Sequence, residues 1–171
     1  MSSGMTGLGA VLAEQMEWTR DWTRRLLADV SGADWTFQPQ AGIGHILWTC
    51  GHLAVSQNVL VFQRCLGKSA LDEAFSAHFP MGGPIPSAVE HKFPEPKAVL
   101  DVMESMQTKT VAAIREMSDA LLREPAFGKD GAAHPHYRDK LGAVTHCFRH
   151  EAFHAGQIAL IRRLLGKSFL R

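Results

Sequence analysis

The residues DKLGAVTHCFRHEAFHAGQIALIRRLLG at positions 139–166 form the longest uninterrupted helical pattern in the sequence. They contain no proline, and small or apolar side chains recur at the spacing of one helix face. His150 and His154 share this face, which also carries Ala143, Cys147, Ile158 and Ile161. Arg162 and Arg163 lie in the last turns, where basic side chains interact favourably with the helix dipole. The stretch therefore predicts a long helix with two histidines on its inward face.

Three earlier segments show the same periodicity, at about Leu8–Val30, Ile43–Leu66 and Pro96–Leu122. In the first of them, Trp22 and Leu26 fall on an arc that we expect to face the core. No segment alternates apolar and polar residues for long enough to predict a strand. Helices of these lengths would each span about 35–42 Å. Four helices of matched length favour an all-α fold, a single four-helix bundle.

The connection 67–95 between the second and third helices is too rich in proline and glycine to be helical and too long for a tight turn. A connection of this length can run along the whole bundle, so that the two helices it joins point the same way. The sequence thus predicts an up-down-down-up bundle with a long crossover loop between helices 2 and 3. The loop is apolar enough to act as a lid over one end of the bundle.

Composition bounds the possible functions. The chain has 171 residues and a formal net charge of +1, so no broad positive field is available to hold a nucleic acid. Its three cysteines are neither paired in a C-x-x-C motif nor closely spaced, which is typical of a reducing compartment. We find no basic-then-apolar leader and no run of about 18 apolar residues. We therefore expect a single domain over residues 1–171, cytoplasmic, with no nucleic-acid partner and no membrane contact.

The nine histidines are the feature most suggestive of function. His150 and His154 are spaced i, i+4, so their imidazoles can converge on one metal ion. His52 lies in the middle of the inward arc of the second helix. Together the three predict a three-nitrogen metal site between facing helices, with a fourth position open to water or substrate. Gly51 and Gly156 lie within two residues of these ligands and can allow close helix packing or leave room for a ligand.

The string His150-Glu151-Ala152-Phe153-His154 also satisfies the H-E-x-x-H pattern of zinc proteases. The 17 residues after His154 contain no His, Asp or Glu to supply a third ligand, and no strand is predicted to align a peptide. These absences argue against a protease. Glu151 can still serve as a catalytic base, and the alternative is a solvated carboxylate or one that supports a ligand.

Other residues near the motif have two interpretations each. His45 is about 10 Å along the helix from His52, too far to share its metal. His146 lies at the margin of the inward face, where we expect a rim or supporting role. Cys147 can be a fourth ligand or a small buried thiol. Trp48 can wall the ligand pocket or fill the core, and Gln157 can orient a ligand or pack against a neighbouring helix.

These residues resemble the DinB-like (YfiT-like) superfamily of four-helix bacterial proteins. The family pattern has a histidine in the second helix, here in Gly51–Ala54, then H-x-x-x-H-x-G-Q-I, here His150 to Ile158, and R-x-x-L-G, here Arg162 to Gly166. The resemblance implies an up-down-down-up bundle whose three histidines bind a divalent metal, zinc or nickel, in a protein that often forms a homodimer. Some relatives are transferases or isomerases that use a low-molecular-weight thiol.

Our first hypothesis is therefore a divalent-metal-dependent enzyme acting on a small-molecule substrate. The resemblance implies thiol-dependent transfer or isomerisation, and metal-dependent hydrolysis is the next candidate. The alternative from another class is a structural or stress-response metal-binding module without turnover, in which the ion only crosslinks helices. A metal-free bundle is preferred if His52 lies far from His150 and His154. A closed fourth ligand such as Cys147 would favour the structural role.

Overall fold

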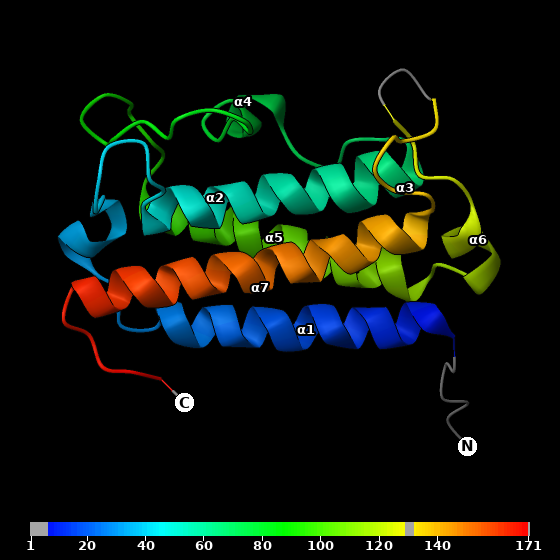
Figure 1. Cartoon of the computed structure of the whole chain (residues 1–171), viewed down its shortest axis with the longest axis horizontal. Coiled ribbons are helices and arrows are strands. Elements are labelled where there is room, and N and C mark those ends of the chain that lie inside the picture. Colours follow the sequence, from blue (N-terminus) through cyan, green and yellow to red (C-terminus); the bar gives the residue numbers. More distant parts are fainter. Residues whose placement is uncertain (1–6, 129–131, 171) are drawn as a thin grey trace.

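Four long helices form the bundle in the computed structural model, which describes residues 7–128 and 132–170 (Figure 1). They are α1 (Leu8–Leu27), α2 (Ile46–Gln57) with its continuation, α5 (Pro96–Arg115) and α7 (Lys140–Leu164). α1 and α7 run in one direction, and α2 and α5 run in the other (Figure 1). The described residues contain no β-strand. The predicted all-α, up-down-down-up bundle is confirmed, and none of the described helices is long and apolar enough to cross a membrane.

The second helix is continuous to Leu66 but changes its winding. α2 passes into the π-helical segment η2 (Asn58–Gln63) and then α3 (Arg64–Leu66). Gly67 ends it with φ of +68°, a left-handed conformation that glycine adopts without a Cβ penalty. The helix begins three residues later than predicted because His45 caps it, its Nδ1 accepting the Trp48 backbone N–H at 3.1 Å.

Polar caps also set the ends of the later helices. The predicted segment 96–122 is broken after α5, because the Ser118 side chain accepts the Leu121 backbone N–H and starts the short helix α6 (Asp119–Arg123). Asp139 caps α7 in the same way through the Gly142 backbone N–H. Of the remaining short helices, η1 (Gly32–Thr36) follows α1 and α4 (Glu73–Ser76) lies in the 67–95 connection.

The buried face of α1 differs from the predicted one. Trp22 is 38% exposed, whereas Arg20 is fully buried and Thr23 lies beside it in the interior. The difference arises because the guanidinium of Arg20 forms an ion pair with Glu151 of α7. A hydrophobic pattern assigns a charged side chain to solvent, so the rotation of α1 about its axis could not be obtained from apolar spacing alone.

The 67–95 connection runs back over α2 (Figure 1). Its aromatic side chains pack against the core. Phe79 is fully buried, and its ring packs on Gly51 so closely that a Cβ there would lie 2.3 Å from two ring carbons. Phe93 stacks on Phe79 and contacts the ring of His45 edge-on, with centroids 5.8 and 4.9 Å apart. Gly51 therefore serves the close approach of the crossover segment to the helix that carries His52.

We expect Gly51→Ala to destabilise the fold by about 1–3 kcal/mol, because the new methyl group forces the Phe79 ring out of its position. Gly156→Ala is the matched control: it is also a mid-helix glycine, but nothing lies within 4 Å of the added Cβ. This control should stabilise the protein by up to about 1 kcal/mol through helix propensity. Urea unfolding of both variants tests the packing, and equal effects of the two substitutions would contradict it.

Candidate metal centre

Three imidazoles from two facing helices converge on one point. The Nε2 atoms of His52 and His150 lie 3.2 Å apart, and those of His150 and His154 lie 3.1 Å apart. All three donor atoms fall within 4.8 Å of one another. Three nitrogens bound tetrahedrally to an ion at about 2.0–2.1 Å are about 3.3 Å from one another. Two of the three separations in the predicted set thus match those of ligands to one ion, and the third is no more than 4.8 Å, so the set fits a metal site.

The environment keeps these imidazoles neutral. Burial, followed by the charge of His154, lowers the pKa of His52 to about 4. Burial and the neighbouring histidines likewise lower the pKa of His150 to about 3. Burial also lowers the pKa of His154. Neutral imidazole is the form that binds metals, so all three side chains are in the ligating state near neutral pH.

Gln157 and Trp48 hold two of the three rings in place. The amide oxygen of Gln157 lies 2.7 Å from Nδ1 of His154, so it accepts the Nδ1 proton and leaves the Nε2 lone pair free. The Trp48 indole stacks on the His52 ring with centroids 4.5 Å apart and an interplanar angle of 12°. Both side chains thus contact the converging histidines, and their contact with a bound cofactor stays a prediction.

Glu151 points into the centre of the bundle and is held there by side chains from two other helices. Its Oε1 accepts from Nε of Arg20 at 2.6 Å and from the Thr23 hydroxyl at 2.9 Å. Its Oε2 accepts from Nη2 of Arg20 at 3.0 Å and from the Gln57 amide at 3.4 Å. With both oxygens engaged and 1% of the residue exposed, the carboxylate supports α7 between the two histidines. Its role as a catalytic base stays a prediction.

Three further residues lie outside the ligand cluster. His45 is buried at the start of α2, where it caps the helix. The His146 ring is half-buried, with its centroid 5.7 Å from that of His150, and its rim or supporting role stays a prediction. Cys147 is buried, burial raises the pKa of its thiol, and it is not part of the group of converging ligand atoms. Within the described residues, no fourth His, Cys, Asp or Glu side chain joins the three histidines.

The sequence model of the DinB superfamily matches residues 15–158, which is most of the chain. The chain belongs to the DinB superfamily. Its fold is similar to that of YfiT from Bacillus subtilis, described as a probable metal-dependent hydrolase with an unusual four-helix bundle topology. The TM-score is 0.67 at 13% identity, covering 98% of this chain and 91% of that one.

A conserved protein from Enterococcus faecalis is also similar, with a TM-score of 0.62 at 15% identity, covering 95% of this chain and 99% of that one. At such identities the likeness concerns the fold alone. None of the curated proteins matches the chain. The family membership thus agrees with the histidine motif.

Sequence reasoning missed Arg20, which holds Glu151 and thereby the histidine-bearing helix. Arg20 also donates to the Met103 backbone carbonyl of α5 at 3.0 Å. Gln57 extends the network to Gln107 of α5, and Gln107 donates to the Met16 carbonyl of α1 at 3.0 Å. In the sequence, the only sign of this network is that each helix carries a polar residue at about the level of the histidine motif. The fold shows that these residues meet in the interior.

We expect Glu151→Ala to cost about 3–5 kcal/mol, because it leaves the Arg20 charge buried without a partner. Asp101→Ala, which breaks the exposed ion pair with Lys97, is the control and should cost less than about 1 kcal/mol. Urea unfolding at pH 7 measures both. Similar losses for the two variants would contradict the structural role of the Arg20–Glu151 pair.

The metal-free protein should lose stability as the pH falls from about 6.5 towards 5. In this window the unfolded chain protonates its histidines, whereas the folded chain keeps His52, with its pKa of about 4, neutral. A depressed pKa therefore stabilises the fold above about pH 6.5, and this stability is lost on acidification, by up to about 1.4 kcal/mol per pH unit for such a histidine.

Urea unfolding of chelator-treated protein at pH 7.0, 6.0 and 5.0 measures this dependence. His52→Gln should show a shallower decline than the wild type because one such histidine is missing. A wild-type stability that stays constant over this range would show that the imidazoles are not held neutral.

Proposed function

We propose that this DinB protein is a divalent-metal-dependent enzyme acting on small molecules. The convergence of three neutral Nε2 atoms from His52, His150 and His154 carries the proposal. The three Nε2 atoms satisfy one another poorly, since His150 Nε2 lies 3.2 and 3.1 Å from two other ring nitrogens and can share only one proton with them. A cation accepts all three lone pairs together. Zinc and nickel both suit imidazole ligands, and they are the ions that we propose.

Catalysis is favoured over a purely structural ion by the ligand count. Structural zinc sites usually have four protein ligands, whereas catalytic sites have three and keep one position for water or substrate. Cys147, the candidate for a closing ligand, lies outside the cluster, and burial raises the pKa of its thiol. The three-ligand set therefore supports turnover rather than helix crosslinking alone.

A divalent ion in this site would supply Lewis acidity, which acidifies a water or thiol and polarises an electrophile. The residues of the chain do the rest. Gln157 keeps the proton of His154 on Nδ1, and Trp48 fixes the plane of the His52 ring. The Arg20–Glu151 pair fixes the position of α7, so that His150 and His154 stay one turn apart on the same face. This rigidity preorganises the ligands before any ion or substrate arrives.

For the reaction, we propose transfer or isomerisation that uses a low-molecular-weight thiol as nucleophile, with hydrolysis as the second candidate. The resemblance of the histidine motif to thiol-dependent relatives supports the first. The description of the B. subtilis protein as a probable metal-dependent hydrolase favours the second. Either a water molecule or a thiol could occupy the open position of the metal. One metal centre could therefore carry out either reaction, depending on which of the two it binds.

The homodimer implied by the resemblance stays a proposal. Trp18 and Phe153 are 64% and 65% exposed on α1 and α7, the two helices that pack side by side. Trp22, Leu160 and Phe169 border an apolar groove of 370 Å³ over the same pair of helices. Large exposed aromatic side chains in one region favour it as the contact surface of a second copy.

Metal content tests the proposed function. Protein purified without a tag or chelator should carry about one divalent ion per chain, measured by elemental mass spectrometry. His52→Ala, His150→Ala and His154→Ala should each lose it. His146→Ala, on the same helix but outside the cluster, should retain it. A wild type that neither carries metal nor takes up zinc or nickel on titration would overturn the proposal.

The loaded protein then distinguishes the two reactions. Incubation of the zinc and nickel forms with an electrophilic test substrate, with and without an added small thiol, separates transfer from hydrolysis by the product formed. A reaction that needs the thiol supports transfer, and one that proceeds in water alone supports hydrolysis. Full metal occupancy with neither product from a broad substrate panel would favour the module without turnover.

A further inference from the structure

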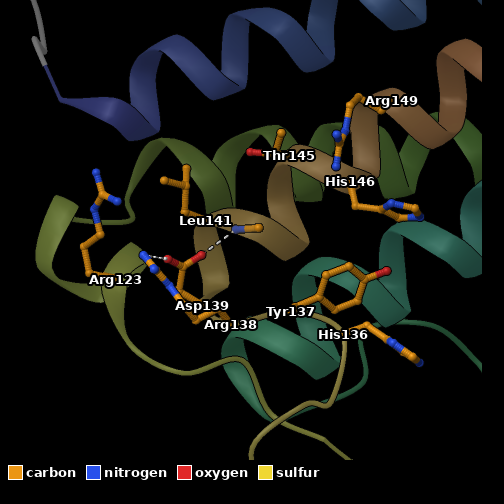
Figure 2. A pocket seen from close by; sticks show the side chains of 10 residues that line it. Arg123, His136, Tyr137, Arg138, Asp139, Leu141, Thr145, His146 and Arg149 are labelled. Carbon is orange, nitrogen blue, oxygen red and sulfur yellow. Dashed lines mark hydrogen bonds and ion pairs between the residues drawn. The ribbon is translucent and has the colours of Figure 1, made fainter.

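A cleft of about 740 Å³ lies beside the metal centre, between α6, the segment leading into α7 and the first half of α7 (Figure 2). Its lining includes three arginines, two histidines and the only tyrosine of the chain. These residues are Arg123, Arg138, Arg149, His136, His146 and Tyr137. Figure 2 shows them around the N-terminal turns of α7, with Tyr137 and His146 on the same side of the cleft.

The cleft is strongly cationic in a chain whose net charge is only +1. Its one acidic lining residue, Asp139, is already engaged. The Asp139 carboxylate accepts the Gly142 backbone N–H at 2.8 Å and lies 3.6 Å from Nη2 of Arg138. Arg123 and Arg149 form no ion pair with any acidic residue in the part of the chain that the structure describes. The cleft thus has an excess of positive charge that is not balanced from within.

The cleft and the three histidines lie next to each other along α7, with His146 and Arg149 of the cleft lining close to His150 in the chain. The ring of Tyr137 is 5.5 Å from that of His146, which is 5.7 Å from that of the ligand His150. Arg149 directly precedes His150 on α7. The positive field reaches both aromatic side chains. Burial is the main cause that lowers the pKa of His146, and the charge of Arg149 lowers it further. Burial raises the pKa of Tyr137, and the charge of Arg149 acts against this rise.

We propose that this cleft binds the anionic group, a carboxylate or a phosphate, of the small-molecule substrate whose reacting atom lies at the three histidines. This inference rests on the proposed function and adds the substrate class to it. Guanidinium groups bind planar or tetrahedral oxyanions through two parallel N–H···O bonds, and Arg149 is free to do so. His146 lies one turn of α7 before His150, so the anionic group and the reacting atom are separated by one to two helical turns, about 5–11 Å.

Calorimetric titration with two oxyanion probes, inorganic phosphate and succinate, tests the cleft separately from the metal. Both metal-free and zinc-loaded protein are used at low ionic strength. We expect the metal-free wild type to bind one equivalent of at least one probe, because the arginines do not need the ion. A preference for phosphate identifies phosphorylated substrates, and a preference for succinate identifies carboxylic acids.

Variants of exposed arginines on one helix make the comparison specific. Arg149→Gln should weaken binding of the probe at least about tenfold, the effect of losing a charge-assisted bidentate contact. Arg149→Lys should retain part of the affinity. Arg163→Gln removes an exposed arginine of the same helix outside the cleft and should leave the affinity unchanged. Thermal unfolding and zinc content of each variant confirm that the fold and the metal centre are intact.

The outcomes separate this inference from the proposed function. No probe binding to the metal-free protein, or binding that Arg149→Gln leaves unchanged, overturns the anion site. If probes bind only to the zinc form and Arg149→Gln has no effect, the anion lies on the metal and the proposed metal function stands alone. Binding that depends on Arg149 in a protein that takes up no metal keeps the anion site and removes the metal enzyme.

Discussion

The buried ion pair between Arg20 and Glu151 is the interaction on which the geometry of the site depends. It joins α1 to α7 through two hydrogen bonds in the interior, where the charge of neither side chain is solvated. Because Glu151 lies between His150 and His154 on one helix, fixing its carboxylate also fixes the height and rotation of both ligands. Gln57 brings α2 into the same network five residues after His52. The network of Arg20, Glu151 and Gln57 therefore sets the positions of the three histidines relative to one another. Apolar contacts, which are interchangeable, would set these positions less specifically.

Topology then decides what surrounds the ligands. Because α2 and α5 are parallel, the chain must return along the bundle through residues 67–95, and this segment covers α2 with Phe79 and Phe93. Gly51 makes that cover possible one residue before His52, since its missing Cβ leaves room for the Phe79 ring. Phe93 also meets the ring of His45 edge-on, and burial lowers the pKa of His45. A crossover segment that connectivity requires thus also packs against the start of the helix that carries His52.

The sequence was sufficient for the parts of the structure that depend on regular spacing. Helical periodicity predicted four helices, proline and glycine predicted the crossover, and the i, i+4 pair with His52 predicted the three imidazoles that the fold brings together. It was insufficient where a tertiary contact overrides local pattern. Trp22 is apolar yet partly exposed, and Arg20 is charged yet buried, because Glu151 reaches Arg20 from a helix more than a hundred residues away. The end of α5 before Ser118 was also not predicted, because the sequence alone does not distinguish a serine that caps a helix from the other serines of the chain.

Charge balance links the histidines to the arginine cleft. Three neutral imidazoles leave the full charge of a divalent ion uncompensated, and the nearest carboxylate in the sequence, Glu151, is already neutralised by Arg20. The arginines of the cleft add further positive charge beside the ligand His150. Under the proposed function, an anionic substrate would balance both, and the ion and the substrate should then each bind more tightly when the other is present. Such coupling is reciprocal by thermodynamic necessity. It would make substrate binding depend on the loaded metal centre and give the ion its highest affinity when substrate is bound.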